Sequence, residues 1–179
     1  MKKIFLIAFC VISVITLKAQ SKTYKNFKVD VGLGYAIPTD GNSNSVGGIT
    51  FTLEPHYRLT DAIALGLRLE SAGLGFKQPG TNDVTVAVVS SYCATGEYYF
   101  MSGGFRPFAG AGLGLFTQQS VTIGSGSSAV ISPSESKFGF FPRVGFETGH
   151  FRISSEYNSI DKGGYIAFKI GFFFGGGKK

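Results

Sequence analysis

The sequence predicts an all-β protein, an eight-stranded antiparallel up-and-down β-barrel that spans a membrane. Two observations predict this fold. In strand-length segments, large apolar residues occupy every second position and the charged residues occupy the positions between them. Side chains of a strand alternate between two faces, so one face of each segment is apolar and the other carries charge or glycine. A barrel with lipid outside and a polar lumen inside has this pattern.

The N-terminal 20 residues are expected to be a secretory signal peptide. Lys2 and Lys3 precede an apolar run over 4–17, and the sequence turns polar after Ala19 and Gln20. The run is shorter than the roughly 20 apolar residues of a membrane-spanning helix. Residues 21–179 are then the barrel domain.

Composition limits the function classes. The chain has 179 residues, enough for one domain, and a formal net charge of +6. Removing Lys2, Lys3 and Lys18 with the leader leaves 14 basic and 11 acidic residues, or +3. Most of these charges lie on the predicted inner face, so a nucleic-acid partner is not expected. Cys93 is then the remaining cysteine, and its position in the alternation places it inward as a small packing residue.

The first half of the chain contains four predicted strands. A Gly/Ser/Asn-rich loop through residue 48, a tight turn at 60–62 and a loop around 78–83 separate them. The strands are expected at 27–37, 49–59, 63–70 and 84–100, with the inward charges Lys28, Asp30, Glu54, Arg58, Arg68, Glu70 and Glu97.

The second half contains four more. A turn at 101–104 precedes them, a long Ser/Gly-rich loop is expected at 117–137, and short turns are expected at 149–150 and 161–164. The strands are expected at 105–115, 138–148, 151–160 and 166–174, with the inward charges Arg106, Arg143, Glu147, Arg152, Glu156 and Lys169. The short connections near 61, 102 and 150 all close one end, as the periplasmic turns of bacterial barrels do.

The inward charges form the candidate site, an ion-pair network that fills the lumen. Seven basic and six acidic residues nearly balance, and a narrow barrel leaves little water, so these groups must pair with one another. The turn at 149–150 is expected to set Glu147 opposite Arg152 and Arg143 opposite Glu156. The sequence therefore favours a closed structural barrel, with a narrow solute pore as the alternative.

Motifs for catalysis, cofactors or metals are weak. Gly110–Gly114 has the spacing of a dinucleotide-binding loop, but it lies in a predicted strand and leads to no helix. Glu54 and His56 share an inward face and leave a lipid-modifying enzyme as a third possibility. His56 and His150 are the only histidines, so we expect no metal site, no cofactor and no enzyme.

Several stretches resemble the small outer-membrane β-barrel family of Gram-negative bacteria, which includes OmpA- and OmpX-like barrels. They are 97–100, 105–114, 141–145, 149–152 with 156–158, and the Phe-rich end at 166–174. The resemblance implies an outer-membrane location, contact with outer-membrane lipid, and assembly by the barrel assembly machinery through Phe172 or Phe174. It also implies a structural or surface-interaction role through extracellular loops, with a ligand that the sequence does not identify.

Overall fold

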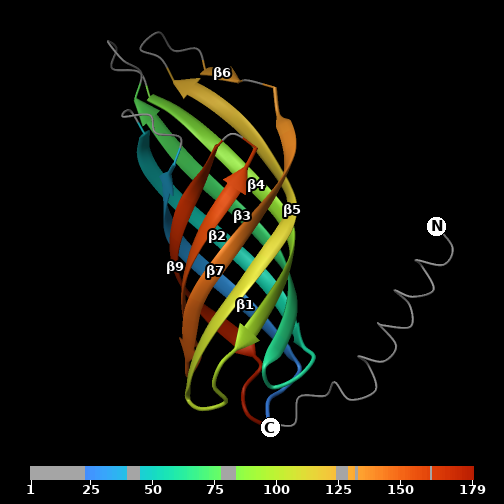
Figure 1. Ribbon diagram of the computed structural model, residues 1–179. Helices are drawn as coiled ribbons and strands as arrows, with labels where there is room; N and C mark the ends of the chain where they lie inside the picture. Colours follow the sequence, from blue (N-terminus) through green and yellow to red (C-terminus); the bar gives the residue numbers. More distant parts are fainter. Residues whose placement is uncertain (1–22, 40–44, 78–83, 124–128, 132, 162) are drawn as a thin grey trace, which may run out of the picture.

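The chain forms a closed barrel of eight long antiparallel strands with one short additional strand (Figure 1). The computed structural model describes residues 23–39, 45–77, 84–123, 129–131, 133–161 and 163–179. The predicted signal peptide lies outside these residues. The strands are β1 (Phe27–Pro38), β2 (Ser45–Arg58), β3 (Ile63–Lys77), β4 (Val84–Tyr99), β5 (Phe105–Ile123), β6 (Ala129–Ile131), β7 (Glu135–Thr148), β8 (Phe151–Ile160) and β9 (Gly163–Gly175).

Each long strand pairs with its neighbours in sequence, and β1 pairs with β9 to close the ring. The closing ladder runs from Lys28 opposite Gly175 to Pro38 opposite Tyr165. The short strand β6 pairs only with the far end of β5, so it lies outside the ring of eight. This arrangement confirms the predicted eight-stranded up-and-down barrel and excludes a two-sheet sandwich.

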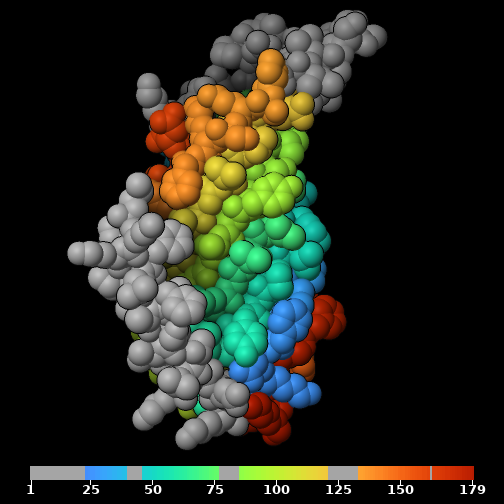
Figure 2. Space-filling view, turned by 90° about the vertical axis from the view of Figure 1, so that its right-hand side faces the viewer, coloured from blue at the N-terminus to red at the C-terminus, as the bar shows by residue number. Residues whose placement is uncertain are grey.

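Alternation sets the two faces of the wall as the sequence predicts. Outward Leu67 is 61% exposed, whereas the neighbouring Arg68 is 0% exposed. Figure 2 shows the outer surface on one side of the barrel, built largely by side chains of β2–β5 and β7. The part of the chain that the structure describes contains no helix with the length and apolar character of a membrane span.

The two ends of the barrel differ. At the end that we call the turn end, residues 59–62, 100–104 and 149–150 join consecutive strands. Gly149 has φ of 58°, a conformation that costs glycine little and suits a two-residue hairpin turn. The opposite end, which we call the loop end, holds β6 and lies at the top of Figure 1. The expected grouping of the three short connections is therefore confirmed.

Strand lengths at the loop end differ from expectation. The predicted third strand stops at Glu70, but β3 continues to Lys77; the predicted loop 117–137 is partly strand, because β5 runs to Ile123 and β7 begins at Glu135. In the β3 extension the apolar residues Ala72 and Leu74 alternate on the inward side, so the outward apolar pattern that marked the predicted strand is lost there. Ladder pairing with neighbouring strands holds all of these extensions. Part of the expected loop through residue 48 is likewise strand, since β2 begins at Ser45.

Two outward prolines, Pro55 and Pro142, lie inside β2 and β7. The β2–β3 ladder skips Glu54 and Pro55, and the β7–β8 ladder skips Phe141 and Pro142. Proline has no N–H to donate, so each of these prolines is left unpaired with one neighbouring strand. The ladder with the other neighbouring strand continues through it.

Candidate functional site in the barrel lumen

All the residues predicted to line the lumen are buried inside the barrel. None is more than 7% exposed, although all thirteen lie on strands whose other face is the outer surface of the barrel. They are Lys28, Asp30, Glu54, Arg58, Arg68, Glu70, Glu97, Arg106, Arg143, Glu147, Arg152, Glu156 and Lys169. The structure groups them into three levels, which we describe from the loop end to the turn end.

The level nearest the loop end is built around Glu70 and Glu156. Lys169 contacts both carboxylates, and Arg68 contacts Glu156. The hydroxyl of Tyr165 donates to Glu70 Oε1 over 2.6 Å. Two acids and two bases are thus closed into one hydrogen-bonded group, which is the condition for burying charge without a large cost.

The middle level is centred on Arg143. Its Nη1 lies 2.8 Å from Glu54 Oε2 and 2.8 Å from Glu97 Oε1, and its Nη2 lies 3.0 Å from Glu156 Oε1. Arg152 contacts Glu97 from the other side. A guanidinium can serve several carboxylates because its donors point outward in one plane. Arg143 therefore joins the middle level to the level above.

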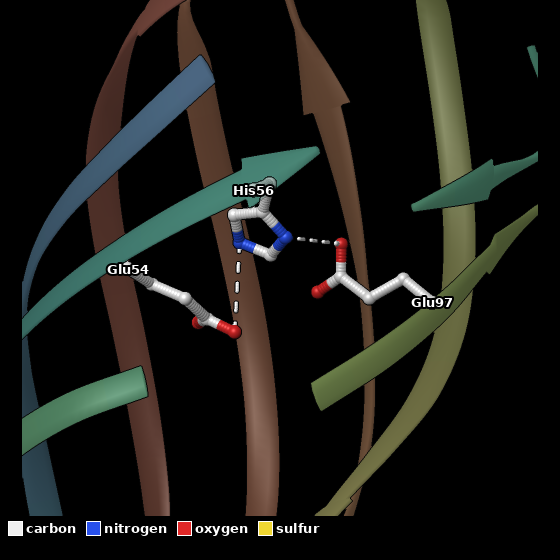
Figure 3. Close-up of side chains that lie close together, drawn as sticks. All are labelled: Glu54, His56 and Glu97. Atoms are coloured by element: carbon white, nitrogen blue, oxygen red, sulfur yellow. Dashed lines mark ion pairs between the residues drawn. The ribbon is translucent and has the colours of Figure 1, made fainter. Parts of the chain in front are cut away.

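Glu54, His56 and Glu97 form the cluster closest to a metal or acid–base site. Their ligand atoms lie within 4.8 Å of one another, with the imidazole between the two carboxylates (Figure 3). His56 Nε2 is 3.5 Å from Glu54 and 2.7 Å from Asp30. Arg143 already donates to both carboxylates of the cluster. A divalent cation would meet that guanidinium at its ligands, so the geometry favours ion pairing over metal binding.

The level nearest the turn end has one carboxylate shared by four cations. Glu147 contacts Lys28 and Arg152 through Oε1, and Arg106 and Arg58 through Oε2 at 3.2 and 3.4 Å. The buried hydroxyl of Tyr99 lies 2.8 Å from Glu147 Oε1 and 2.8 Å from Glu97 Oε2. Tyr99 thereby connects this level to the middle one.

Residues before β1 and after β9 cover the lumen at the turn end. Tyr24 and Lys178 form a bridge, and the Lys25 amide donates to the Gly177 carbonyl. The hydroxyl of Tyr24 donates to the carbonyls of Ser102 and Gly103, across the mouth of the barrel. The C-terminal residues Gly176–Lys178, which we call the tail, thus pack against the turn end of the barrel. Arg58 Nη1 donates to the Gly176 carbonyl over 2.7 Å.

The loop end of the lumen is apolar, which the sequence reasoning missed. Inward residues there form a hydrophobic cluster of Ala36, Ala72, Leu74, Ala87, Val89, Cys93, Phe116, Phe141, Tyr165 and Ala167. Cys93 is 3% exposed, inside this cluster, as the alternation predicts. The lumen is therefore not filled by ion pairs throughout: charge fills the turn end and middle, and apolar side chains fill the loop end.

Sequence reasoning placed each charge on the correct face but missed several neutral partners. His56 entered only as a possible acid–base residue, and Tyr99 and Tyr165 were not considered. Their inward parity was the available signal, since Tyr99 follows outward Tyr98. Within the described residues, a cavity of about 20 Å³ lies beside Asp30, Glu54 and Arg152, which is room for about one water molecule.

The predicted register across the 149–150 turn is confirmed. Arg143 is opposite Glu156 and Glu147 is opposite Arg152 in the β7–β8 ladder. Both pairs also make ion contacts, at 3.0 and 2.8 Å. A tight hairpin turn leaves one register open to the two strands, which is why the sequence could specify these neighbours.

The sequence model of the outer membrane protein beta-barrel domain matches residues 7–175. No curated protein matches the chain. Solved structures with a similar fold include Ail, the attachment invasion locus protein of Yersinia pestis, in complex with the heparin analogue sucrose octasulfate. It is 16% identical, with a TM-score of 0.55 over 83% of this chain and 99% of that one.

Two further barrels show the same likeness. Neisserial surface protein A is 16% identical, with a TM-score of 0.53 over 85% of this chain and 98% of that one. The outer membrane protein OprG of Pseudomonas aeruginosa is 13% identical, with a TM-score of 0.53 over 88% of this chain and 99% of that one. At these identities the likeness concerns the fold.

Proposed function

We propose that this barrel is closed to solutes and presents its loop end to the cell exterior. The chain belongs to the outer membrane protein beta-barrel domain family and lies in the outer membrane, and the proposal proceeds from that. The observation that carries the proposal is the filled lumen. Three levels of ion pairs and an apolar cluster occupy successive parts of it. A solute would have to break both, so recognition at the outer end is the better-supported role.

The wall at the loop end supports this orientation. Outward Ser71, Ser90, Thr117 and Ser136 are paired from strand to strand across β3, β4, β5 and β7. Thr117 and Ser136 also share a hydrogen bond of 2.8 Å between their hydroxyls. This polar belt interrupts the apolar outer surface on that side, and outward Val88 is the next apolar position beyond it on β4. Beyond it, β3, β4 and β5 continue to Lys77, Val84 and Ile123 and form a wall that can meet a partner.

The charge of the loop end narrows the kind of ligand. Its connections and the strand ends beside them carry three basic residues, Lys77, Lys137 and Lys162, against four acidic residues, Asp40, Asp83, Glu135 and Asp161. Ail has been solved with a sulfated heparin analogue, but a near-neutral loop end lacks the basic excess that such a polyanion requires. We therefore expect this chain to recognise uncharged polar groups through its Ser-, Asn- and Gly-rich loops.

Planar-bilayer recording tests the closed lumen. The refolded chain should give no steady unitary conductance in 1 M KCl, whereas a steady conductance would favour the narrow pore.

Two cell-based experiments test the remaining roles. Altered lipid A on overexpression, lost in His56→Ala, would favour the enzyme. Replacing residues 119–134 with a two-residue Asn-Gly turn keeps the β5–β7 ladder up to Gln118 opposite Glu135, so it should leave the ring of eight strands intact. It should remove adhesion of expressing cells, and adhesion that survives would move recognition away from this loop.

A further inference from the structure

The network is uneven in charge, and its excess lies at the turn end. In the two upper levels, four carboxylates (Glu54, Glu70, Glu97 and Glu156) meet four cations (Arg68, Arg143, Arg152 and Lys169). At the turn end, Lys28, Arg58 and Arg106 share only Asp30 and Glu147 among the described residues. One buried cation there has no carboxylate of its own. A buried charge without a partner is costly, so a site for an additional anion would stabilise this level.

Arg106 is the cation that this imbalance leaves least satisfied. Its one ion contact in the described chain is to Glu147, which three other cations also contact. Nη2 makes that contact at 3.2 Å without hydrogen-bond geometry, and Nε donates no hydrogen bond, although the residue is only 4% exposed. Its guanidinium carbon lies 4.3 Å from the ring centres of both Tyr24 and Tyr99. The two rings fix the guanidinium but supply no acceptor for its edge.

A cavity of about 190 Å³ adjoins this guanidinium at the turn end. Arg106, Lys178 and His150 line it, and so does Glu147, whose carboxylate already contacts four cations. Two cations and an imidazole therefore face the same space as one shared carboxylate. Gly103 and Gly104 contribute backbone without side chains, and a methyl group at Gly104 would meet no atom within 4 Å. The volume exceeds that of one water molecule several-fold. The cavity can therefore admit a polyatomic ion.

We propose that this cavity binds a phosphate-class oxyanion, held by the Arg106 guanidinium and the Lys178 ammonium. A guanidinium donates in parallel to two oxygens of such a group, and a lysine adds a point charge. The oxygens of a tetrahedral ion point in several directions. The ion can therefore accept from Arg106 on the barrel side and from Lys178 on the side of the C-terminal residues. The same chemistry is offered by a free phosphate ester of the periplasm or by the headgroup of an anionic phospholipid at the barrel rim.

Arginine side-chain N–H signals in NMR spectra of the full mature chain test this site. The probe is inorganic phosphate, added to the protein in alkyl-glucoside micelles at constant ionic strength kept with chloride. We expect one arginine signal to shift saturably, and to be absent in Arg106→Gln. Lys178→Gln alters an exposed tail residue, so it should fold and should weaken binding about three-fold or more. The control is Lys137→Gln, an exposed lysine at the loop end, which should bind as the parent does.

A second arm separates the two sources of the ion. In nanodiscs of phosphatidylglycerol without added phosphate, a shifted Arg106 signal that free phosphate no longer moves would assign the site to the lipid headgroup. A signal that still responds to free phosphate would assign it to a soluble ester. Small, non-saturating shifts of all arginine signals, or equal affinities of Lys178→Gln and Lys137→Gln, would overturn the proposal.

Discussion

The guanidinium carbon of Arg68 lies 3.6 Å from the ring centre of Phe141, at the level where the ion-pair network ends and the apolar cluster begins. Arg68 is fully buried, and so is Phe141. A cation over an aromatic ring gains attraction without needing water. This contact lets a charged level and an apolar level adjoin inside one narrow lumen, and it places Phe141 as the cover of the network on its loop-end side.

Phe141→Ala should therefore destabilise the barrel strongly. It removes the ring over Arg68 and leaves a cavity, which typically costs about 3–5 kcal/mol in a packed interior. Urea unfolding of the protein reconstituted in lipid measures the change. Phe140→Ala is the matched control, because Phe140 is the next residue and is 56% exposed on the outer face. An equal loss in both variants would contradict the role given to the Phe141 ring.

Gly112→Ala should destabilise through the same ring. A methyl group at Gly112 would collide with the Phe141 ring and with the Thr95 side chain. Overpacking of this kind costs about 1–3 kcal/mol. Phe141→Leu in the same chain should recover part of that loss by removing ring atoms, and the unfolding midpoint of the double variant reports it. A double variant that loses the sum of the two single effects would show that the ring is not what Gly112 makes room for.

The faces of the wall could be predicted from the sequence because each position depends only on its parity along the strand. Lys28 and Arg152 follow that rule, as does Cys93. The turn at 149–150 also fixed the register of Arg143 and Glu147 against β8, since a two-residue hairpin has little freedom. These are local properties of the chain, and they determined the architecture.

Partners across the lumen could not be predicted, because they depend on strand tilt and on the stagger of the closed ring. Lys28 and Glu147 form an ion pair although they are 119 residues apart in the sequence. Arg143 and Glu54 are 89 residues apart. The apolar cluster was missed partly for the same reason. Leu74 lies on the extension of β3, beyond the predicted strand. Val89 lies within the predicted fourth strand and has inward parity, but its partners across the lumen also depend on tilt and stagger.

Cys93 gives a direct readout of an inward position. Its thiol is buried and lies 3.8 Å from Arg68 Nη2. In the folded barrel of residues 21–179 it should resist a polar thiol reagent, and it should react fully after unfolding. Ser102→Cys in a Cys93→Ser background is the control, since residue 102 is exposed in the turn after β4 and should react at once. Fast labelling of Cys93 in the folded state would mean that water and reagents enter the apolar end.

A charge on the lipid face should be poorly tolerated. Leu67 and Val144 are 61% and 59% exposed on the outer surface. Arginine at either position should cost about 2–4 kcal/mol near the bilayer midplane. Gln119→Arg is the control: it faces outward beyond the polar belt, on the extension of β5. Refolding into phosphatidylcholine vesicles with urea titration measures all three, and equal tolerance would contradict the assigned faces.

The inward parity of Thr52, among carboxylates, would suggest that it accepts an arginine more readily than the lipid face does, but the filled lumen argues against this. Thr52 is 5% exposed and donates to Glu70 Oε2 over 3.0 Å, in a lumen that is already filled. An arginine there would have to displace Lys169 or Arg68 from the same carboxylate. We now expect Thr52→Arg to be at least as costly as Leu67→Arg in the same refolding titration.

Glu147 and Arg152 provide the test of the network as a unit. They lie opposite each other across the β7–β8 ladder and 2.8 Å apart, but Glu147 also serves three further cations. Glu147→Gln should therefore cost about 3–5 kcal/mol, since it leaves buried cations unpaired. Arg152→Gln also removes contacts to Glu97 and Asp30, so it should be costly as well.

The double variant Glu147→Gln/Arg152→Gln should lose less than the sum of the two single losses. With both groups neutral, neither leaves its former partner as an isolated buried charge, so part of each single penalty is shared. A double-mutant cycle from urea unfolding measures that coupling. A matched cycle on exposed Lys137 and Asp161, 3.1 Å apart at the loop end, should give well under 1 kcal/mol. Additivity within about 0.5 kcal/mol for the buried pair would mean that water screens these charges and that the lumen is open to solvent.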